Sequence, residues 1–321
     1  MPESNRRRIK ASEPSRFRSP IGRAQLAGCA FLLGLSFAVA VDAAQAQPDE
    51  VAWTTAGSFP KTLFEAIWGY QPGEGRKEQS EDERRLEPDR PHFPEASTTV
   101  GLGRAVVESG YTFTTKGNSF VSHSAPEALL RVGMLADWFE FRIGQNFIDQ
   151  QQTVAGATTS AAGAQDLYLG VKFALAEQQG FLPALAIIPQ MTVPTGSRAV
   201  TADRILPGVN VDSSWEVIKN LFSIEVLVAN NLVQGDLGDV HHELGTGLTG
   251  VYQITKEVEG FAEWDAFYPT GGVGPIGPRH QVVAGLVYFV TADFAVDARV
   301  GAGLNSRSNA FLAGVGFAAR F

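Results

Sequence analysis

Regular alternation of apolar and polar side chains constrains this sequence more than any other feature. Between residues 167 and 175, the odd positions hold Leu, Val or Phe, whereas the even positions hold Tyr, Gly, Lys and Ala. A period of two places the two sets on opposite faces of a β-strand. The pattern recurs in 12 segments: 103–115, 126–134, 138–149, 164–176, 182–196, 208–218, 221–231, 242–254, 257–268, 279–290, 293–304 and 309–321. The sequence therefore predicts an all-β protein.

The length of these segments indicates where the strands lie. They are 9 to 15 residues long, whereas strands of soluble proteins average about 5 or 6. A tilted strand needs about 9 to 11 residues to cross a membrane. Lipid offers the backbone no hydrogen bonds, so spanning strands must form a closed sheet. We predict a single closed antiparallel transmembrane β-barrel of about 12 strands over residues 98–321.

Short and long connections alternate between the segments. Tight links fall at 136–137, 219–220, 255–256 and 291–292. Long connections fall between them, at 116–125, 150–163, 197–207, 232–241 and 269–278. Outer-membrane barrels have short periplasmic turns and longer outer loops. This order predicts that both chain termini are periplasmic and that the long loops lie outside; only the last outer loop, 305–308, is short.

The chain ends on an alternating strand whose last residue is Phe321. This end is similar to the C-terminal strand by which the barrel-assembly machinery recognises outer-membrane proteins. We therefore expect Phe321 to act as an assembly signal and the machinery to be a partner.

The first 46 residues are typical of a secretory signal peptide. A basic region precedes an apolar stretch at 26–41, and Ala44-Gln45-Ala46 provides a small-x-small cleavage site. Cleavage after Ala46 would remove Cys29, the single cysteine of the chain. The net charge of −8 argues against nucleic acid as a partner. We predict export to the bacterial outer membrane, with its lipid as a partner.

Residues 47–97 form a predicted periplasmic extension of different composition. Residues 59–70 favour a short amphipathic helix, for which three roles stay open: plugging a pore, lying on a membrane or binding a periplasmic partner. Residues 71–95 are rich in Pro, Glu, Asp and Arg and have little to bury. Such a stretch cannot offset its ordering entropy, so we expect a disordered linker with a solvated charge run at 81–89.

Side-chain parity assigns aromatic, glycine and proline residues to positions in the barrel. Aromatic residues on outward positions suit the interface girdles of a membrane barrel; they are Trp215, Tyr252, Trp264, Tyr268 and Tyr288. Inward glycines are expected to relieve crowding in a narrow lumen. Three prolines between 183 and 194 predict a bulge or bend in that strand.

The same parity turns most strand charges toward the lumen, where they avoid lipid. The candidates are Glu108, Glu127, Arg131, Glu140, Arg142, Asp166, Lys172, Glu216, Glu225, Glu263, Asp265, Asp297 and Arg299. One interpretation is a network of paired charges that fills the lumen, and the other is a selectivity lining. Acids outnumber bases nine to four in this list, so an aqueous path should favour cations.

No pattern in the sequence predicts catalysis. His92 falls in the expected linker, and His123, His241 and His280 fall in or beside outer loops. A serine hydrolase needs a base close to its nucleophile, and no Gly-x-Ser-x-Gly motif is present. We predict no catalytic residue, no cofactor and no metal.

Several segments together resemble a known outer-membrane family. They are 130–142, 165–175, 183–197, 261–268 and 285–321, with Asp166, Gly170 and Lys172 followed by Pro-Thr-Gly at 194–196 as the most specific pair of motifs. They are similar to the family of the putative MetA-pathway of phenol degradation. The resemblance covers about 105–321 and implies an outer-membrane barrel that helps small, often aromatic compounds to cross. It does not extend to residues 47–97.

We therefore expect a channel-like or transporter-like barrel that passes small solutes. The main alternative is a structural or surface-interaction barrel with a sealed lumen. A third is a lipid-active barrel enzyme. The sequence leaves the solute, the opening of the lumen and the oligomeric state undetermined.

Overall fold

The computed structural model describes residues 60, 62–68, 85–117, 119–235, 238–273 and 277–321. The predicted signal peptide, 1–46, and a large part of the extension lie outside these residues. The described residues all belong to one compact unit, Ala52–Phe321.

The described residues contain thirteen strands and one short helix, which confirms the all-β class. The helix is α2 (Leu63–Trp68). The strands are β1 (Ala105–Thr115), β2 (Phe120–Gly133), β3 (Phe139–Val154), β4 (Ala157–Ala164), β5 (Leu167–Ala176), β6 (Ala184–Val193), β7 (Leu206–Ile218), β8 (Phe222–Gln234), β9 (Val240–Gln253), β10 (Val258–Thr270), β11 (Arg279–Phe289), β12 (Phe294–Gly303) and β13 (Phe311–Arg320).

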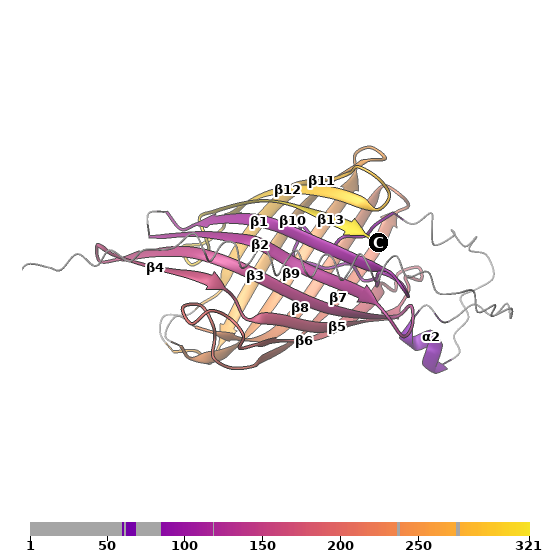
Figure 1. Cartoon of the computed structure of the whole chain (residues 1–321). Helices are drawn as coiled ribbons and strands as arrows, with labels where there is room; N and C mark the ends of the chain where they lie inside the picture. Colours follow the sequence, from indigo (N-terminus) through magenta and orange to yellow (C-terminus); the bar gives the residue numbers. More distant parts are fainter. Residues whose placement is uncertain (1–59, 61, 69–84, 118, 236–237, 274–276) are drawn as a thin grey trace, which may run out of the picture. The chain divides into compact units, whose positions relative to one another are not determined.

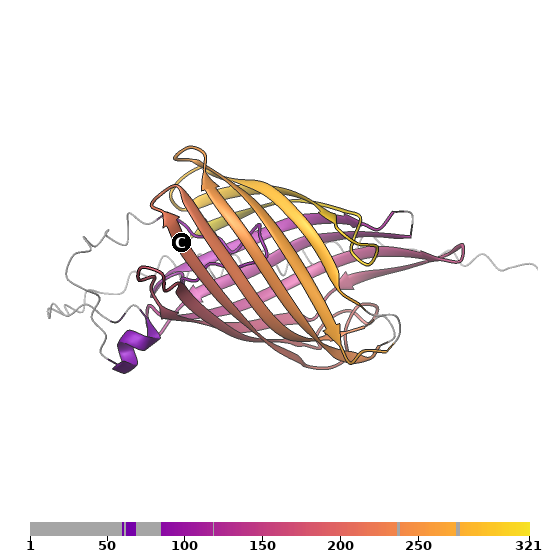
Figure 2. The ribbon, with the colours of Figure 1, turned by 180° about the vertical axis from the view of Figure 1, so that it is seen from behind.

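Twelve of these strands close into an antiparallel barrel, as predicted (Figures 1 and 2). Each strand pairs with its neighbour in sequence, except that β3 pairs with β5, and the β1–β13 pairing closes the ring. The last residue takes part in closure: Ala105 N donates to Phe321 O at 3.1 Å, and Phe321 N donates to Ala105 O at 2.8 Å. The last strand of the chain thus closes the wall of the barrel against β1.

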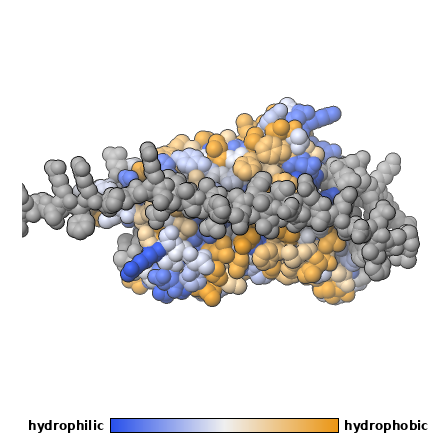
Figure 3. Space-filling model, in the orientation of Figure 1, coloured by the Kyte–Doolittle hydropathy of each residue, from blue (hydrophilic) through white to orange (hydrophobic). Residues whose placement is uncertain are grey.

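The outer face of the wall is apolar. Leu248, Leu286, Val300 and Val315 are exposed there, and Figure 3 shows apolar residues over the visible wall, with hydrophilic residues near its ends. The inward positions of the same strands carry buried charges, such as Glu108 in β1. This arrangement suits a sheet whose outer face meets lipid.

Two predicted loops are wrong in part. The stretch expected as an outer loop, 150–163, continues β3 and turns back as β4, from Phe147↔Ala164 to Val154↔Ala157. Residues 120–125, also expected in a loop, belong to β2. The exposed hairpin has small and polar residues on both faces. The alternation that marks a membrane strand is therefore missing, although the backbone still pairs.

The predicted irregularity at the prolines is present. The β5–β6 ladder runs from Leu167↔Val193 to Gly170↔Gln190, is interrupted opposite Pro189 and resumes at Phe173↔Ile187. Its register then shifts between Ala174 and Ala176. Proline lacks the N–H that a ladder requires, so the strand continues with a local defect.

Helix α2 lies within the range in which the sequence favours a helix. Thr62 Oγ1 accepts a hydrogen bond from Glu65 N at 3.2 Å, and Thr62 N donates to the Glu65 carboxylate at 3.4 Å. This reciprocal pair is a capping box, which satisfies free donors at a helix start. Within the described part of the chain, no helix is both long and apolar enough to span a membrane.

Candidate functional site

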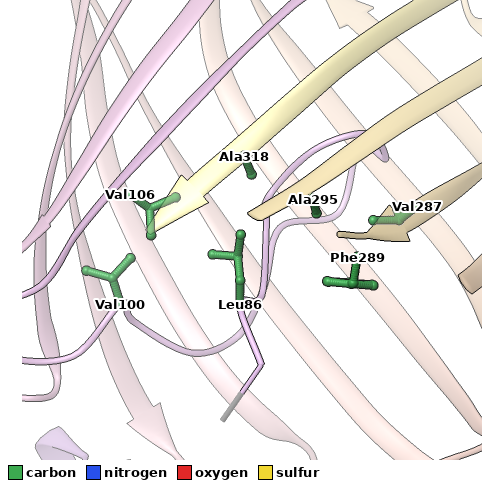
Figure 4. Close-up of a cluster of buried hydrophobic side chains, with 7 residues drawn as sticks. All are labelled: Leu86, Val100, Val106, Val287, Phe289, Ala295 and Ala318. Carbon is green, nitrogen blue, oxygen red and sulfur yellow. The ribbon is translucent and has the colours of Figure 1, made fainter. Parts of the chain in front are cut away.

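Residues 85–100, which we call the lumen segment, lie among the inward-facing side chains of the barrel. Leu86 packs in a buried apolar cluster with Val106 of β1 and Phe289 of β11; the full cluster is Leu86, Val100, Val106, Val287, Phe289, Ala295 and Ala318 (Figure 4). Leu86 N donates to Ala292 O at 2.8 Å. The cluster anchors the segment near the end of the barrel at which the chain terminates.

The lumen segment corrects the expectation of a solvated linker. Asp89, Pro91 and Pro94 are buried, so residues 85–95 are held inside the protein, while 71–84 lie outside the described residues. Composition alone indicates water as the partner of these charges. The barrel wall instead supplies buried counter-charges, which the sequence of the segment alone does not reveal.

One side of the lumen wall is basic and binds the acids of the segment. Arg131 of β2 and Arg142 of β3 are directly opposite each other in the ladder, and like charges in such a pair repel. The Asp89 carboxylate lies between them, 3.3 Å from Arg131 Nε and 2.8 Å from Arg142 Nη2. Lys172 Nζ of β5 lies 3.1 Å from the same carboxylate. Asp89 is thereby a counter-charge shared by three buried cations, in addition to the wall acids Glu140 and Glu108, which lie 2.9 Å and 3.0 Å from Arg131.

A second acid of the segment supports this arrangement. Glu95 Oε2 lies 2.6 Å from Arg142 Nη1 and 3.8 Å from Lys172 Nζ. Lys172 Nζ also donates to Ala96 O at 2.9 Å. The basic wall therefore holds the segment at two acidic side chains and at its backbone.

Acidic residues bind the bases of the segment. Arg90 lies 2.7 Å from Glu127 of β2 and 3.5 Å from Asp297 of β12. His92 Nδ1 lies 3.3 Å from Glu225 of β8 and 2.6 Å from Pro94 O. The segment thus presents acids to the basic wall and bases to acidic groups of the wall.

Wall carboxylates also satisfy the backbone of the segment. Glu108 accepts hydrogen bonds from Asp89 N and Arg90 N, each at 3.0 Å. Phe93 N donates to Glu263 at 2.9 Å, and Glu95 N donates to Asp212 at 3.0 Å. The segment has no regular secondary structure, so its buried N–H groups need such acceptors. This need accounts for part of the excess of inward acids.

Glycines in the wall provide space for the segment. A Cβ atom at Gly247 of β9 would lie 3.0 Å from both Phe93 Cδ1 and Pro94 Cγ. A Cβ atom at Gly316 of β13 would lie 2.5 Å from Arg90 Nε. A larger residue at either position would press on the segment.

For two residues of the segment, neighbouring charges shift the pKa against the direction that burial favours. Burial alone would raise the pKa of Asp89, but Arg131, Lys172 and Arg142 outweigh it and hold that pKa well below its usual value. Burial alone would lower the pKa of His92, but Glu225 and then Glu263 outweigh it and raise that pKa. In both cases the surroundings favour the charged form over the neutral one.

The structure brings most of the predicted lumen charges together around the segment. Those bonded or ion-paired to it are Glu108, Glu127, Arg131, Glu140, Arg142, Lys172, Glu225, Glu263, Asp297 and Arg299. Asp265 lines a cavity beside the segment. Their part in solute passage stays a prediction.

Two of the predicted lumen charges lie apart from this group. Asp166 accepts from Gly196 N at 3.0 Å and from Ala202 N at 2.9 Å, so it holds a loop. Glu216 is exposed and accepts from Asn220 N at 2.8 Å in the β7–β8 turn.

Sequence reasoning missed five polar residues of the site: Asp89, Arg90, His92, Glu95 and Asp212. Asp212 is buried and inward on β7, and strand parity could have found it. The other four belong to the segment, where no periodicity marks a buried position.

The predicted girdle residues are on outward positions at two levels. Trp215, Tyr252 and Tyr288 lie near the strand ends closest to the tight turns, and Tyr268 lies near the opposite end of β10. Trp264 stacks on His280, with ring centroids 5.8 Å apart. Contact of these rings with lipid stays a prediction.

A closed antiparallel barrel with an apolar outside and a charged inside is the architecture of an outer-membrane β-barrel protein. The chain belongs to the family described as "Putative MetA-pathway of phenol degradation", whose model matches residues 88–321. The match begins inside the lumen segment, so the family likeness extends further toward the N-terminus than the sequence suggested.

One solved structure supports the fold, and a second is a weaker likeness. An outer membrane channel from Pseudomonas putida F1 aligns with a TM-score of 0.58 and 12% identity, over 72% of this chain and 100% of that chain. The translocator domain of the autotransporter NalP from Neisseria meningitidis aligns with a TM-score of 0.41 and 14% identity, over 69% of this chain and 88% of that one. No curated protein matches the chain.

The Asp89→Asn variant tests the role of the shared carboxylate. It should lower the free energy of unfolding by about 3–5 kcal/mol, because it leaves Arg131, Arg142 and Lys172 without their common counter-charge. Denaturant unfolding of the refolded protein in detergent measures this change. Asp293→Asn is the control, since that carboxylate is mostly exposed. Equal stability of both variants would contradict the assignment.

The His92→Gln variant tests the acidic contact of the segment. A raised folded pKa means that His92 stabilises the fold fully below its unfolded pKa of about 6.5. This contribution disappears as the pH rises through the higher folded pKa. The stability difference between wild type and His92→Gln should therefore shrink with rising pH, as measured by unfolding from pH 5 to pH 9. A difference that grows with pH would refute the contact.

Proposed function

We propose that this protein is an outer-membrane channel for small solutes and that the lumen segment restricts its opening. The observation that supports this proposal is the kind of contact that holds the segment. It is bound mainly by ion pairs and hydrogen bonds to the wall. Such contacts can be exchanged for water, whereas a lumen meant only to stay closed could be filled with apolar side chains. The barrel is a channel and not an enzyme in this proposal.

The solute class follows from the family and the wall. The family description supports small compounds, including aromatic ones, as the solutes. The excess of inward acids supports a preference for cations along any aqueous path. Asp166, near an outer loop, and Glu216, near a tight turn, would carry that lining toward both ends of the barrel.

The proposed location is the bacterial outer membrane. Residues 1–46 would direct export, and the barrel-assembly machinery would read the last strand, which ends at Phe321. The aromatic residues at Trp215, Tyr252, Trp264, Tyr268 and Tyr288 would lie at the lipid interfaces. Residues 47–84 would then remain on the periplasmic side.

A sealed structural barrel is the second candidate. The observation in its favour is the lumen segment itself, which contacts opposite parts of the wall, Arg142 of β3 through Asp89 and Glu263 of β10 through Phe93 N. In that case the ion pairs would serve stability alone, and partners would bind the loops or the periplasmic extension.

Planar-bilayer conductance of the refolded mature protein separates these candidates. A form that lacks residues 47–97 should show larger or more frequent conductance steps than the mature chain, because the lumen segment no longer occupies the path. The reversal potential should indicate cation preference. Folding of both forms is checked by heat-dependent mobility in gels. If both forms fold and neither conducts, the channel proposal fails and the sealed barrel is supported.

A further inference from the structure

A cavity of about 300 Å³ lies beside the lumen segment; we call it the outer chamber. Its lining includes Thr112 near the end of β1, Leu312 near the start of β13 and Gln281 near the start of β11. These positions belong to the half of the barrel away from the chain terminus. Asp89, Arg90 and His92 of the segment form another side of the chamber. Glu108 and Arg142, which lie nearer the tight turns, also line the chamber, so it extends alongside the segment.

Most charges around the outer chamber already have partners. Asp89 binds Arg131, Arg142 and Lys172, and Arg90 binds Glu127 and Asp297. Arg299 of β12 donates to Pro91 O and, at 3.0 Å, to Thr112 Oγ1. These groups hold the protein together and are not free to bind a ligand.

Asp265 of β10 is a buried acid of the chamber that forms no ion pair with a described residue. Its Oδ2 accepts a hydrogen bond from Gln281 Nε2 at 3.0 Å. Its Oδ1 is buried and accepts no hydrogen bond from an N–H or hydroxyl group of the described residues, and the neighbouring Glu263 carboxyl is close enough to share a proton with it. A buried acceptor left without a donor costs about 1–3 kcal/mol, so a donor from a ligand would restore what the protein does not supply.

The charge next to Asp265 makes a cationic donor the best match. Glu263 lies two residues earlier on the same face of β10. Glu263 accepts from Phe93 N and from Thr249 Oγ1, which are both uncharged donors. In the described part of the chain, no Lys or Arg forms an ion pair with either carboxyl group. His92 and Arg299 act on these carboxyl groups without a direct ion pair, and two neighbouring carboxylates that lack an ion pair attract a cation or share a proton.

The rest of the lining favours an organic cation over a metal ion. Phe93, Leu129, Val283 and Leu312 present apolar surface to the chamber, and an aromatic ring such as that of Phe93 attracts a nearby cation. No group of three or more acidic, His or Cys residues among the described ones could hold a metal ion. The volume is at the lower end of the range for small-molecule sites.

We propose that the outer chamber binds a small organic ammonium with a short apolar group, and that Asp265 Oδ1 accepts its N–H. Glu263 adds negative potential, and the apolar lining contacts the hydrocarbon part. The proposal rests on the proposed function, since it names a solute class for the same channel. The ligand needs no chemical change; it binds and leaves.

Ligand-observed NMR titration of the folded mature protein in detergent with propylammonium chloride tests this site. Wild type should bind it, and Asp265→Asn should weaken binding at least about ten-fold, the size expected for a lost charged hydrogen bond. Asp265→Glu should retain most of the affinity. The matched control is Glu243→Gln, because Glu243 is paired with Arg279 and does not line the chamber. It should bind like wild type.

Two further arms complete the test. Propanol, which has the same chain without the charge, should not compete, and potassium chloride should not displace propylammonium at equal concentration. Val283→Phe narrows the chamber without touching a charge and should also weaken binding, so the test survives if Asp265→Asn does not fold. Equal affinity of wild type and Asp265→Asn, competition by propanol, or equal displacement by potassium would overturn the proposal.

The titration does not depend on conductance, so the two proposals can fail separately. Ammonium binding with a silent bilayer would retain the site and reject the channel. Conductance steps without any propylammonium binding would retain the channel and reject the site.

Discussion

The Asp89 carboxylate, placed among three buried cations, is the contact on which the interior of this barrel depends. Arg131 and Arg142 face each other across adjacent strands, and Lys172 lies on the next strand of the ring. The wall acids Glu108 and Glu140 offset part of this positive charge. The Asp89 carboxylate, which comes from outside the strands, is the acid that contacts all three cations. The charges of the wall and those of the lumen segment are therefore complementary, and each set stabilises the buried position of the other.

The same complementarity sets the path of the segment. Acids at Asp89 and Glu95 meet the basic wall, whereas Arg90 turns to Glu127 and Asp297. Wall carboxylates also take the N–H groups that an irregular chain leaves unpaired. A lumen built in this way is held strongly yet without an apolar core, except near Leu86. That combination is compatible with the restriction that we propose for the lumen segment.

How far the sequence predicts this molecule depends on whether a residue sits in a periodic element. Alternation fixes the barrel strands because lipid on one side and polar contacts on the other impose a period of two. The hairpin at β4 was not predicted, because a strand with water on both faces has no imposed period. The burial of the lumen segment was not predicted for a different reason. It depends on partners such as Arg131 and Arg142, which lie far along the chain and do not enter the local composition. Parity alone did place the wall charges that receive it.

Reversible cross-linking of the lumen segment to the wall tests the central claim most directly. Pro94 lies beside Gly247 of β9, where an added Cβ atom would be 3.0 Å from Pro94 Cγ. The double variant Pro94→Cys with Gly247→Cys, in the otherwise cysteine-free chain that cleavage after Ala46 would leave, can be oxidised and then reduced in the bilayer chamber. We expect few or small conductance steps in the oxidised form, and larger or more frequent steps after reduction. The same conductance in both states, with the disulfide confirmed, would show that the segment does not control the path.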